Sequence, residues 1–160
     1  MLIGVMADSH DNVPKIEAAV SVFNQRGVEH VLHAGDFVAP FAIDPLRALE
    51  CPLLAVFGNN DGERLGLAAR IREIGEVHAY LATATLADRR LAMVHYPELA
   101  EPLARSGAFD LVIYGHTHRV DQRRDDGLLL NPGETGGWLT GCSTVAVVDL
   151  TRLQVELHEL

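Results

Sequence analysis

The stretch Leu2-Ile3-Gly4-Val5-Met6-Ala7-Asp8-Ser9-His10 sets the fold class of this chain. Its first six residues form a short apolar run, which predicts a buried β-strand. Asn12 suits the position before a helix, and the residues after it keep helical spacing until Gly27, which predicts the helix end. The chain therefore begins as a strand–helix unit, and the polar residues Asp8 and His10 come just after the strand.

The rest of the chain continues this alternation in its first half and then becomes mostly strand. This order predicts an α/β fold with two packed sheets and helices outside them, in a single domain over residues 1–160. The predicted strands cover residues 2–7, 31–34, 52–57, 80–86, 89–95, 111–114, 120–124, 128–131, 144–149 and 154–160. The predicted helices cover residues 12–27, 45–49, 63–74 and 97–106, and Arg123-Arg124-Asp125-Asp126 predicts a solvated turn.

Polar side chains follow five of the predicted apolar strands at the point where each strand ends. In α/β proteins sites are built at the carboxyl ends of strands, so we expect these side chains to share one cavity. Carboxylate, amide and imidazole donors without thiolates suit divalent metals such as manganese, iron, zinc, nickel or cobalt. The polar groups at the strand ends are Asp8 and His10, Gly35-Asp36, Gly58-Asn59-Asn60-Asp61, His95, and Gly115-His116-Thr117-His118.

These motifs resemble those of the calcineurin-like metallophosphoesterases, and most closely the branch of small, single-domain bacterial and archaeal phosphodiesterases. The order and the approximate spacing agree along almost the whole chain, and Asn131-Pro132-Gly133 resembles a late turn of that branch. The resemblance implies a sandwich of two mixed β-sheets flanked by helices, which agrees with the order of elements. The motifs that carry it are Asp8-x-His10, Gly35-Asp36, Gly58-Asn59-x-Asp61, His95 and Gly115-His116-Thr117-His118.

The resemblance also implies a centre of two divalent metal ions that hydrolyses phosphodiester bonds. Manganese is the expected metal, with iron, zinc, nickel or cobalt as alternatives, and a metal-bridging hydroxide would be the nucleophile. The catalytic residues would be Asp36, Asn59 and His95. The first metal would be bound by Asp8, His10, Asp36 and His118, and the second by Asp36, Asn59, His95 and His116.

The chain departs from the family pattern at two positions. Many members have a histidine after the metal-binding Asn, whereas this chain has Asn60, which cannot act as a general acid near neutral pH. This change favours diesters, or esters with good leaving groups, over alkyl monoesters. Tyr96 stands where the family usually has glycine. Its ring would narrow the entrance of the expected cavity or stack on a base of the substrate; the alternative is an aromatic residue at the rim without a special role.

Other residues near the motifs have weaker signals. Asp61 is assigned to the catalytic set as a residue that orients Asn60 or a ligand. Arg119 follows His118 and would meet a phosphate oxygen, with an exposed surface guanidinium as the alternative. His33 is expected to be a structural or surface residue that at most supports a metal ligand from behind.

The composition limits the partners and the location of the protein. The chain has 160 residues, 48% of them hydrophobic, and a formal net charge of −9. The negative charge disfavours nonspecific nucleic-acid binding, so a small phosphoester is the expected partner, and apolar edge strands make a homo-oligomer reasonable. No apolar run reaches the roughly 18–20 residues of a membrane-spanning helix, which predicts no membrane partner. With no basic segment at the N-terminus, a cytoplasmic location is expected.

Three other functions remain for comparison. The fold also resembles a eukaryotic retromer subunit, so a protein-binding scaffold with weak or absent catalysis is the main alternative to an enzyme. A nuclease of the double-strand-break repair type is disfavoured, because the chain has no room for a capping domain and has the wrong charge for DNA. A secreted acid phosphatase is disfavoured because no tyrosine occupies a plausible ligand position.

Overall fold

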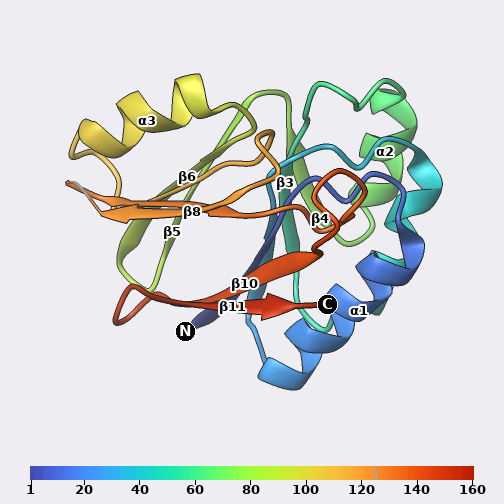
Figure 1. Cartoon of the computed structure of the whole chain (residues 1–160), viewed down its shortest axis with the longest axis horizontal. Coiled ribbons are helices and arrows are strands. Elements are labelled where there is room, and N and C mark those ends of the chain that lie inside the picture. Colours follow the sequence, from blue (N-terminus) through green and yellow to red (C-terminus); the bar gives the residue numbers. More distant parts are fainter. Residues whose placement is uncertain (125) are drawn as a thin grey trace.

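A computed structural model describes residues 1–124 and 126–160, and its strands form two mixed sheets that lie against each other (Figure 1). Asp125, which the sequence places in a solvated turn, lies outside the described residues. The first sheet has the order β11-β10-β1-β2-β3-β4, in which β1 to β4 run parallel and β10 pairs antiparallel with β1. Its strands are β1 (Leu2–Met6), β2 (His30–His33), β3 (Leu53–Val56), β4 (Gly75–His78), β10 (Thr144–Asp149) and β11 (Gln154–Glu159).

The second sheet has the order β5-β6-β7-β9-β8 and is also mixed. Its three central strands run parallel, and the two outer strands pair antiparallel with their neighbours. The predicted sandwich of two mixed sheets flanked by helices is therefore confirmed. The strands of this sheet are β5 (Leu81–Leu86), β6 (Arg89–Val94), β7 (Leu111–Ile113), β8 (Val120–Arg124) and β9 (Leu128–Pro132).

Helices cover the outer faces of both sheets. Helices α1 (Val13–Arg26) and α2 (Arg64–Ile71) pack against the first sheet, and α3 (Pro97–Arg105) packs against the second (Figure 1). Side chains along β1 point alternately to the two faces of the first sheet. Ile3 and Val5 face the second sheet and Met6 faces the helices, so the first sheet is buried on both faces.

Between the first sheet and α1, glycine permits a close approach. A Cβ atom at Gly4 would lie 2.6 Å from the ring of Phe23 in α1, so the absence of a side chain there lets the ring pack directly on the strand. Phe23 is fully buried. The packing of α1 on the sheet fixes the direction in which the chain leaves β1, toward the loop that carries Asp8 and His10.

Several local expectations were wrong. The segment Gly75–His78 is an edge strand, β4, which the sequence did not predict, and α2 ends at Ile71, whereas the predicted helix ran to residue 74. The helix predicted over residues 45–49 is a 3-10 turn, η2 (Pro45–Ala48), and a second one, η1 (Pro40–Ile43), precedes it. The side chain of Asn12 donates to the carbonyl of Gly136 at 2.7 Å and does not cap α1.

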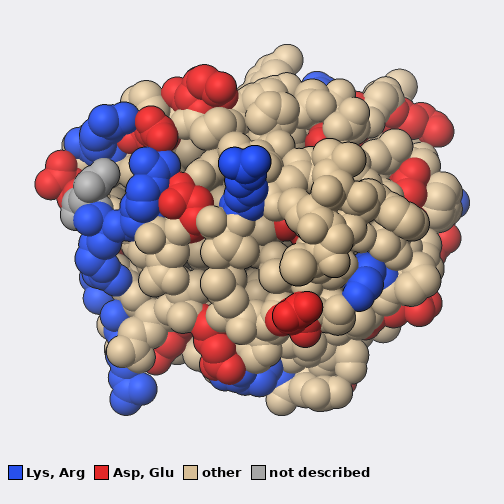
Figure 2. All heavy atoms as spheres, in the orientation of Figure 1, with Lys and Arg blue, Asp and Glu red and all other residues tan. Residues whose placement is uncertain are grey.

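Acidic side chains are scattered in separate groups over the face drawn in Figure 2, and a column of basic side chains runs along one edge. Strand β8 reaches that edge. In this strand, Arg123 is ion-paired with Asp121 at 2.8 Å and with Glu101 at 3.0 Å, so its charge is balanced locally. No helix within the described residues has the length and apolar character needed to cross a membrane.

Candidate metal centre

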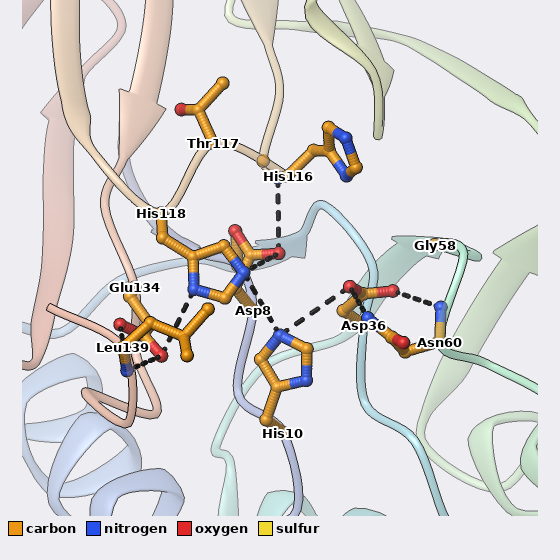
Figure 3. Close-up of polar contacts among 12 residues, drawn as sticks. Asp8, His10, Asp36, Gly58, Asn60, His116, Thr117, His118, Glu134 and Leu139 are labelled. Carbon is orange, nitrogen blue, oxygen red and sulfur yellow. Dashed lines mark hydrogen bonds and ion pairs between the residues drawn. The ribbon is translucent and has the colours of Figure 1, made fainter.

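Loops at the carboxyl ends of β1, β2, β3, β6 and β7 bring the predicted polar residues to one edge of the sandwich (Figure 3). Parallel strands end at the same edge of a sheet, which is why residues from distant parts of the chain meet there. The residues gathered at this edge are Asp8, His10, Asp36, Asn59, His95, His116 and His118.

Four of these residues form a first donor group. One ligand atom each from Asp8, His10, Asp36 and His118 lies within 4.8 Å of the others. Nε2 of His10 lies 3.6 Å from Oδ2 of Asp36 and 3.3 Å from Nε2 of His118. Nε2 of His118 lies 3.8 Å from Oδ1 of Asp8. The separations are those of side chains that can converge on one cation.

Asp8 provides the test of whether a cation fits. Its carboxylate is fully buried, and among the residues that the structure describes its Oδ2 has no hydrogen-bond partner. Such an atom costs stability unless something positive or hydrogen-bonding meets it. A divalent ion bound by the first donor group would meet it, so the residues present fit a metal.

A second donor group shares Asp36 with the first. Oδ2 of Asp36 lies 3.5 Å from Nε2 of His95. Oδ1 of Asn59 lies 2.9 Å from Nε2 of His95 and 2.9 Å from Nδ1 of His116. Oxygen and imidazole donors again converge, and the carboxylate of Asp36 lies between the two groups.

The protonation of the two carboxylates differs. Burial raises the pKa of Asp8 to about 7, against the opposing charges of His95 and His118. Burial also opposes the charge on Asp36, but contacts with His95 and donors from Asn60 outweigh it and hold its pKa far below its usual value. Without a cation, Asp36 is therefore ionised near neutral pH, while Asp8 is partly protonated.

The histidines are tuned by burial and by these carboxylates. Burial lowers the pKa values of His10 and His116, which leaves their rings neutral and able to donate a lone pair to a metal. Burial also acts to lower the pKa of His95, but Asp36 outweighs it and the pKa is raised. Nδ1 of His95 lies 2.8 Å from the carbonyl oxygen of Ala34, which fixes the ring so that Nε2 points toward Asp36 and Asn59.

The backbone at the ligands is strained. Five of the donor residues lie in the left-handed region, where side chains other than glycine are uncommon. Residues held there cluster at functional sites, because the surrounding structure imposes the conformation. The φ angles are 52° for Asp8, 43° for His10, 63° for Asp36, 68° for His116 and 59° for His118.

Asp61 holds the loop of Asp36 in place. Its buried carboxylate accepts hydrogen bonds from the backbone N–H groups of Asp36 at 3.0 Å, Gly58 at 2.7 Å and Val38 at 2.8 Å. The two loops after β2 and β3 are thus tied together through one side chain. The catalytic role predicted for Asp61 stays a prediction.

Glu134, in the loop after β9, is a residue that the sequence analysis missed. It is 1% exposed, and its Oε1 lies 3.2 Å from Nδ1 of His118, on the side of the ring away from Asp8 (Figure 3). Burial opposes its charge, but donors from Leu139 and Thr140 outweigh it and lower its pKa. Glu134 thus places a buried negative charge behind the ring of His118.

His33 is buried behind the loops that carry Asp8 and Asp36. Its Nδ1 accepts the N–H of Gly35 at 3.1 Å, so its Nε2 carries the proton and donates to Oγ of Ser9 at 3.0 Å. Oγ of Ser9 lies 3.5 Å from the carbonyl oxygen of Asp36. The three groups connect the loops after β1 and β2.

The residues predicted to contact substrate differ in their placement. Nδ2 of Asn60 donates to Oδ2 of Asp36 at 2.8 Å, so Asn60 lies beside the carboxylate that the two donor groups share. The ring of Tyr96 lies 5.0 Å from the ring of His116, beside the second donor group. The side chain of Arg119 is exposed and has no hydrogen bond or ion pair within the described part of the chain. These three contacts with substrate stay predictions.

Comparison with known proteins identifies the family. Residues 1–153 match the calcineurin-like phosphoesterase superfamily domain. The chain belongs to the calcineurin-like phosphoesterase superfamily. The predictions of this family and of a hydrolytic enzyme are thereby confirmed.

The phosphoesterase is similar to archaeal proteins along its whole length. Phosphodiesterase MJ0936 of Methanocaldococcus jannaschii is 40% identical over 157 residues, which cover 95% of each chain. A solved structure described as a novel archaeal phosphodiesterase has a TM-score of 0.95 and 36% identity, and the match covers 100% of both chains. Vps29 of Chaetomium thermophilum has a TM-score of 0.72 at 18% identity, covering 100% of this chain and 95% of that one. This last likeness shows the fold alone.

Proposed function

We propose that this chain is a phosphodiesterase that depends on two divalent metal ions and acts on small phosphodiesters. In this proposal the first ion is bound by Asp8, His10, Asp36 and His118 and the second by Asp36, Asn59, His95 and His116. Residues 1–160 act as one domain. Manganese is the proposed metal, because oxygen and imidazole donors without thiolates suit it, with iron, zinc, nickel or cobalt as alternatives.

One observation carries the proposal. Oδ2 of Asp36 lies 3.6 Å from Nε2 of His10, in the first donor group, and 3.5 Å from Nε2 of His95, in the second. A carboxylate shared between two such groups is the expected arrangement for a bridging ligand. Two divalent ions bound there would stabilise negative charge on the phosphoryl oxygens and activate the nucleophile.

The residues of the chain prepare this chemistry. Asn60 is fixed against Asp36 by its backbone N–H at 2.8 Å to Oδ1 and by its side-chain amide at 2.8 Å to Oδ2. An amide does not donate a proton to a leaving group near neutral pH, so the leaving group must depart without help from this position. This supports a preference for diesters, or for esters with good leaving groups, over alkyl monoesters.

Substitution of the shared carboxylate tests the proposal. Asp36→Asn should reduce hydrolysis of bis(p-nitrophenyl) phosphate by at least about 100-fold, because it removes the charge that both ions require. The matched control is Asp88→Asn, since Asp88 is exposed and has a φ of 60°, close to the 63° of Asp36. Circular dichroism would check that both variants are folded, and elemental analysis would count and identify the bound metals.

The outcomes separate the parts of the proposal. Activity retained in a folded Asp36→Asn protein would refute the bridging role. One bound metal per chain in a fully active protein would refute the dinuclear centre. The wild-type protein should hydrolyse bis(p-nitrophenyl) phosphate faster than p-nitrophenyl phosphate, and equal or faster hydrolysis of the monoester would contradict the role given to Asn60.

A protein-binding scaffold of the same fold is the second candidate. An apolar groove beside α3 favours it, because Tyr80, Leu81 and Leu99 are 66%, 45% and 47% exposed there. Protein purified without chelators that contains no metal and hydrolyses neither ester would favour the scaffold over the enzyme. A cytoplasmic location, a homo-oligomer and the lack of a nucleic-acid partner stay predictions.

A further inference from the structure

Two large apolar side chains are exposed beside the first donor group. Trp138 is 65% exposed and Leu139 is 79% exposed, in the loop between β9 and β10. Exposed apolar surface at a defined place often marks a binding site. Together with Val38 and Asn60 these residues line a hollow of about 330 Å³, and His10 and His118 also line it.

The hollow is continuous with the metal centre. In Figure 3, Leu139 lies on one side of His118 and His10, and Asn60 lies on the other. A phosphoryl group held by the donor groups would therefore place one of its ester groups next to this hollow. We call the exposed side chains of Trp138 and Leu139 the apolar wall.

The apolar wall is held in a fixed position. The indole N–H of Trp138 donates to the carbonyl oxygen of His10 at 2.9 Å. The carboxylate of Glu134 accepts the backbone N–H groups of Trp138 at 2.8 Å, Leu139 at 3.1 Å and Thr140 at 3.0 Å. The same carboxylate lies 3.2 Å from Nδ1 of His118.

One buried carboxylate thus fixes the backbone of the wall and also lies against His118, a ligand of the proposed first metal. A side chain preorganised in this way binds a ligand without the entropic cost of ordering a flexible loop. Across the hollow, Asn60 offers a side-chain oxygen that could accept a hydrogen bond from the bound group, since its amide nitrogen is used by Asp36.

We propose that Trp138 and Leu139 form the subsite for one ester group of the phosphodiester, and that this group carries a flat aromatic ring. The inference rests on the proposed function, because the metals would hold the phosphoryl group. A ring stacked on an indole gains about 1–3 kcal/mol, which corresponds to a factor of about 5–150 in affinity. The ring could belong to a nucleoside or to a simple aryl group, and the test distinguishes these sources.

Phosphate monoesters test the subsite without ambiguity, because each has a single ester group. We would measure the dissociation constants of methyl phosphate, phenyl phosphate and thymidine 5′-phosphate for the metal-loaded protein by isothermal titration calorimetry. The wild-type protein should bind a ring-bearing ester at least about 5-fold more tightly than methyl phosphate. A gain with both ring-bearing esters would indicate an aryl-type subsite, and a gain with thymidine 5′-phosphate alone would indicate a nucleoside subsite.

Trp138→Ala should abolish this preference and leave the affinity for methyl phosphate unchanged, while Trp138→Phe should keep part of it. Tyr80→Ala is the matched control, because Tyr80 is an aromatic residue with 66% exposure, close to the 65% of Trp138. If Trp138→Ala still binds ring-bearing esters more tightly than methyl phosphate, the subsite is overturned. It is also overturned if Trp138→Ala loses affinity equally for methyl phosphate and for ring-bearing esters, because Trp138 would then act only through His10.

The failure of the subsite and the failure of the proposed function can be told apart. Trp138 is the sole tryptophan of the chain, so its fluorescence reports directly on a ring bound against it. Quenching by thymidine 5′-phosphate without hydrolysis of any diester would contradict the phosphodiesterase and support the subsite. Diester hydrolysis with no ring preference and no quenching would support the phosphodiesterase and overturn the subsite.

Discussion

Acidification is expected to destabilise the metal-free protein through His33. The ring is fully buried and stacks on Phe37, with 3.7 Å between the ring centres. Both ring nitrogens are used, since Nδ1 accepts the N–H of Gly35 and Nε2 faces Oγ of Ser9. Protonation would bury a charge and break the bond from Gly35. Burial accordingly lowers the pKa of His33 from 6.5 to about 3.

The sign and the size of the effect follow from linkage between protonation and folding. Between pH 6.5 and pH 3 the unfolded chain holds a proton on His33 and the folded protein does not. The free energy of unfolding therefore falls as the pH falls through this window, by about 1.4 kcal/mol per pH unit. From pH 7.5 to pH 5 the loss is about 2 kcal/mol, and the curve levels off at higher pH, where the ring is neutral in the unfolded chain as well.

Asp8 acts in the opposite direction, so the wild-type curve alone is not diagnostic. Burial raises the pKa of Asp8 from 3.8 to about 7, and the folded protein therefore binds this proton more tightly than the unfolded chain. In the metal-free protein this adds stability as the pH falls from 7 toward 3.8. The contribution of His33 must be isolated as a difference between wild type and variant.

Urea unfolding in the presence of a chelator, followed from pH 7.5 to pH 5, provides the measurement. His33→Gln lacks the titrating ring, so its stability relative to wild type should rise by about 2 kcal/mol between pH 7.5 and pH 5. His78→Gln is the control, because the side chain of His78 is 42% exposed and the same chemical change is made. Parallel stability curves for wild type and His33→Gln would refute the reasoning.

Two further predictions concern the support of the metal ligands. Glu134→Gln removes the charge behind His118 and should weaken metal binding by about 10–100-fold in chelator competition. Glu159→Gln, at an exposed position, should leave metal binding unchanged, and equal affinities of the two variants would contradict a role of Glu134 in metal binding. Gly58→Ala would place a Cβ 2.1 Å from Oδ1 of Asp36, and the displaced carboxylate should reduce kcat/KM for diesters by about 100-fold. Gly62→Ala is the control, because its new Cβ has no atom within 4 Å, and it should be active. Similar activities in the two glycine variants would show that a Cβ at position 58 does not disturb Asp36.

The sequence predicted the layers of the fold because the core strands have a strong local signal. Strands such as β1 and β3 are short apolar runs that end in glycine or polar residues, and their periodicity can be recognised without knowledge of their partners. Strand β4 has no such signal, since Gly75-Glu76-Val77-His78 contains one large apolar residue. Its pairing depends on a tertiary contact: a Cβ at Gly75 would lie 1.8 Å from the carbonyl oxygen of Leu53.

The candidate ligands were also recognisable, because each follows a strand at the edge where sites form. Glu134 was not assigned, although it lies two residues after the end of β9, because its role depends on contact with His118, which the sequence does not show. Its position directly after Asn131-Pro132-Gly133, and the sole tryptophan four residues later in a glycine-rich loop, were the signals available. Neither of these features repeats along the chain as the residues of a strand or helix do. Their role can therefore be recognised only from the contacts in the folded structure.

The ligand loops are built against the preferences that make the core strands predictable. Five donor residues adopt left-handed backbone, and a fully buried carboxylate oxygen of Asp8 has no partner among the described residues. Each feature costs of order 1–3 kcal/mol, and neither is compensated by packing within the loops. The apolar clusters on either face of the sheets supply the stability that tolerates them. A cation bound by the donors would offset the cost at Asp8, so the strain and the unpaired oxygen are themselves arguments for a metal at this edge.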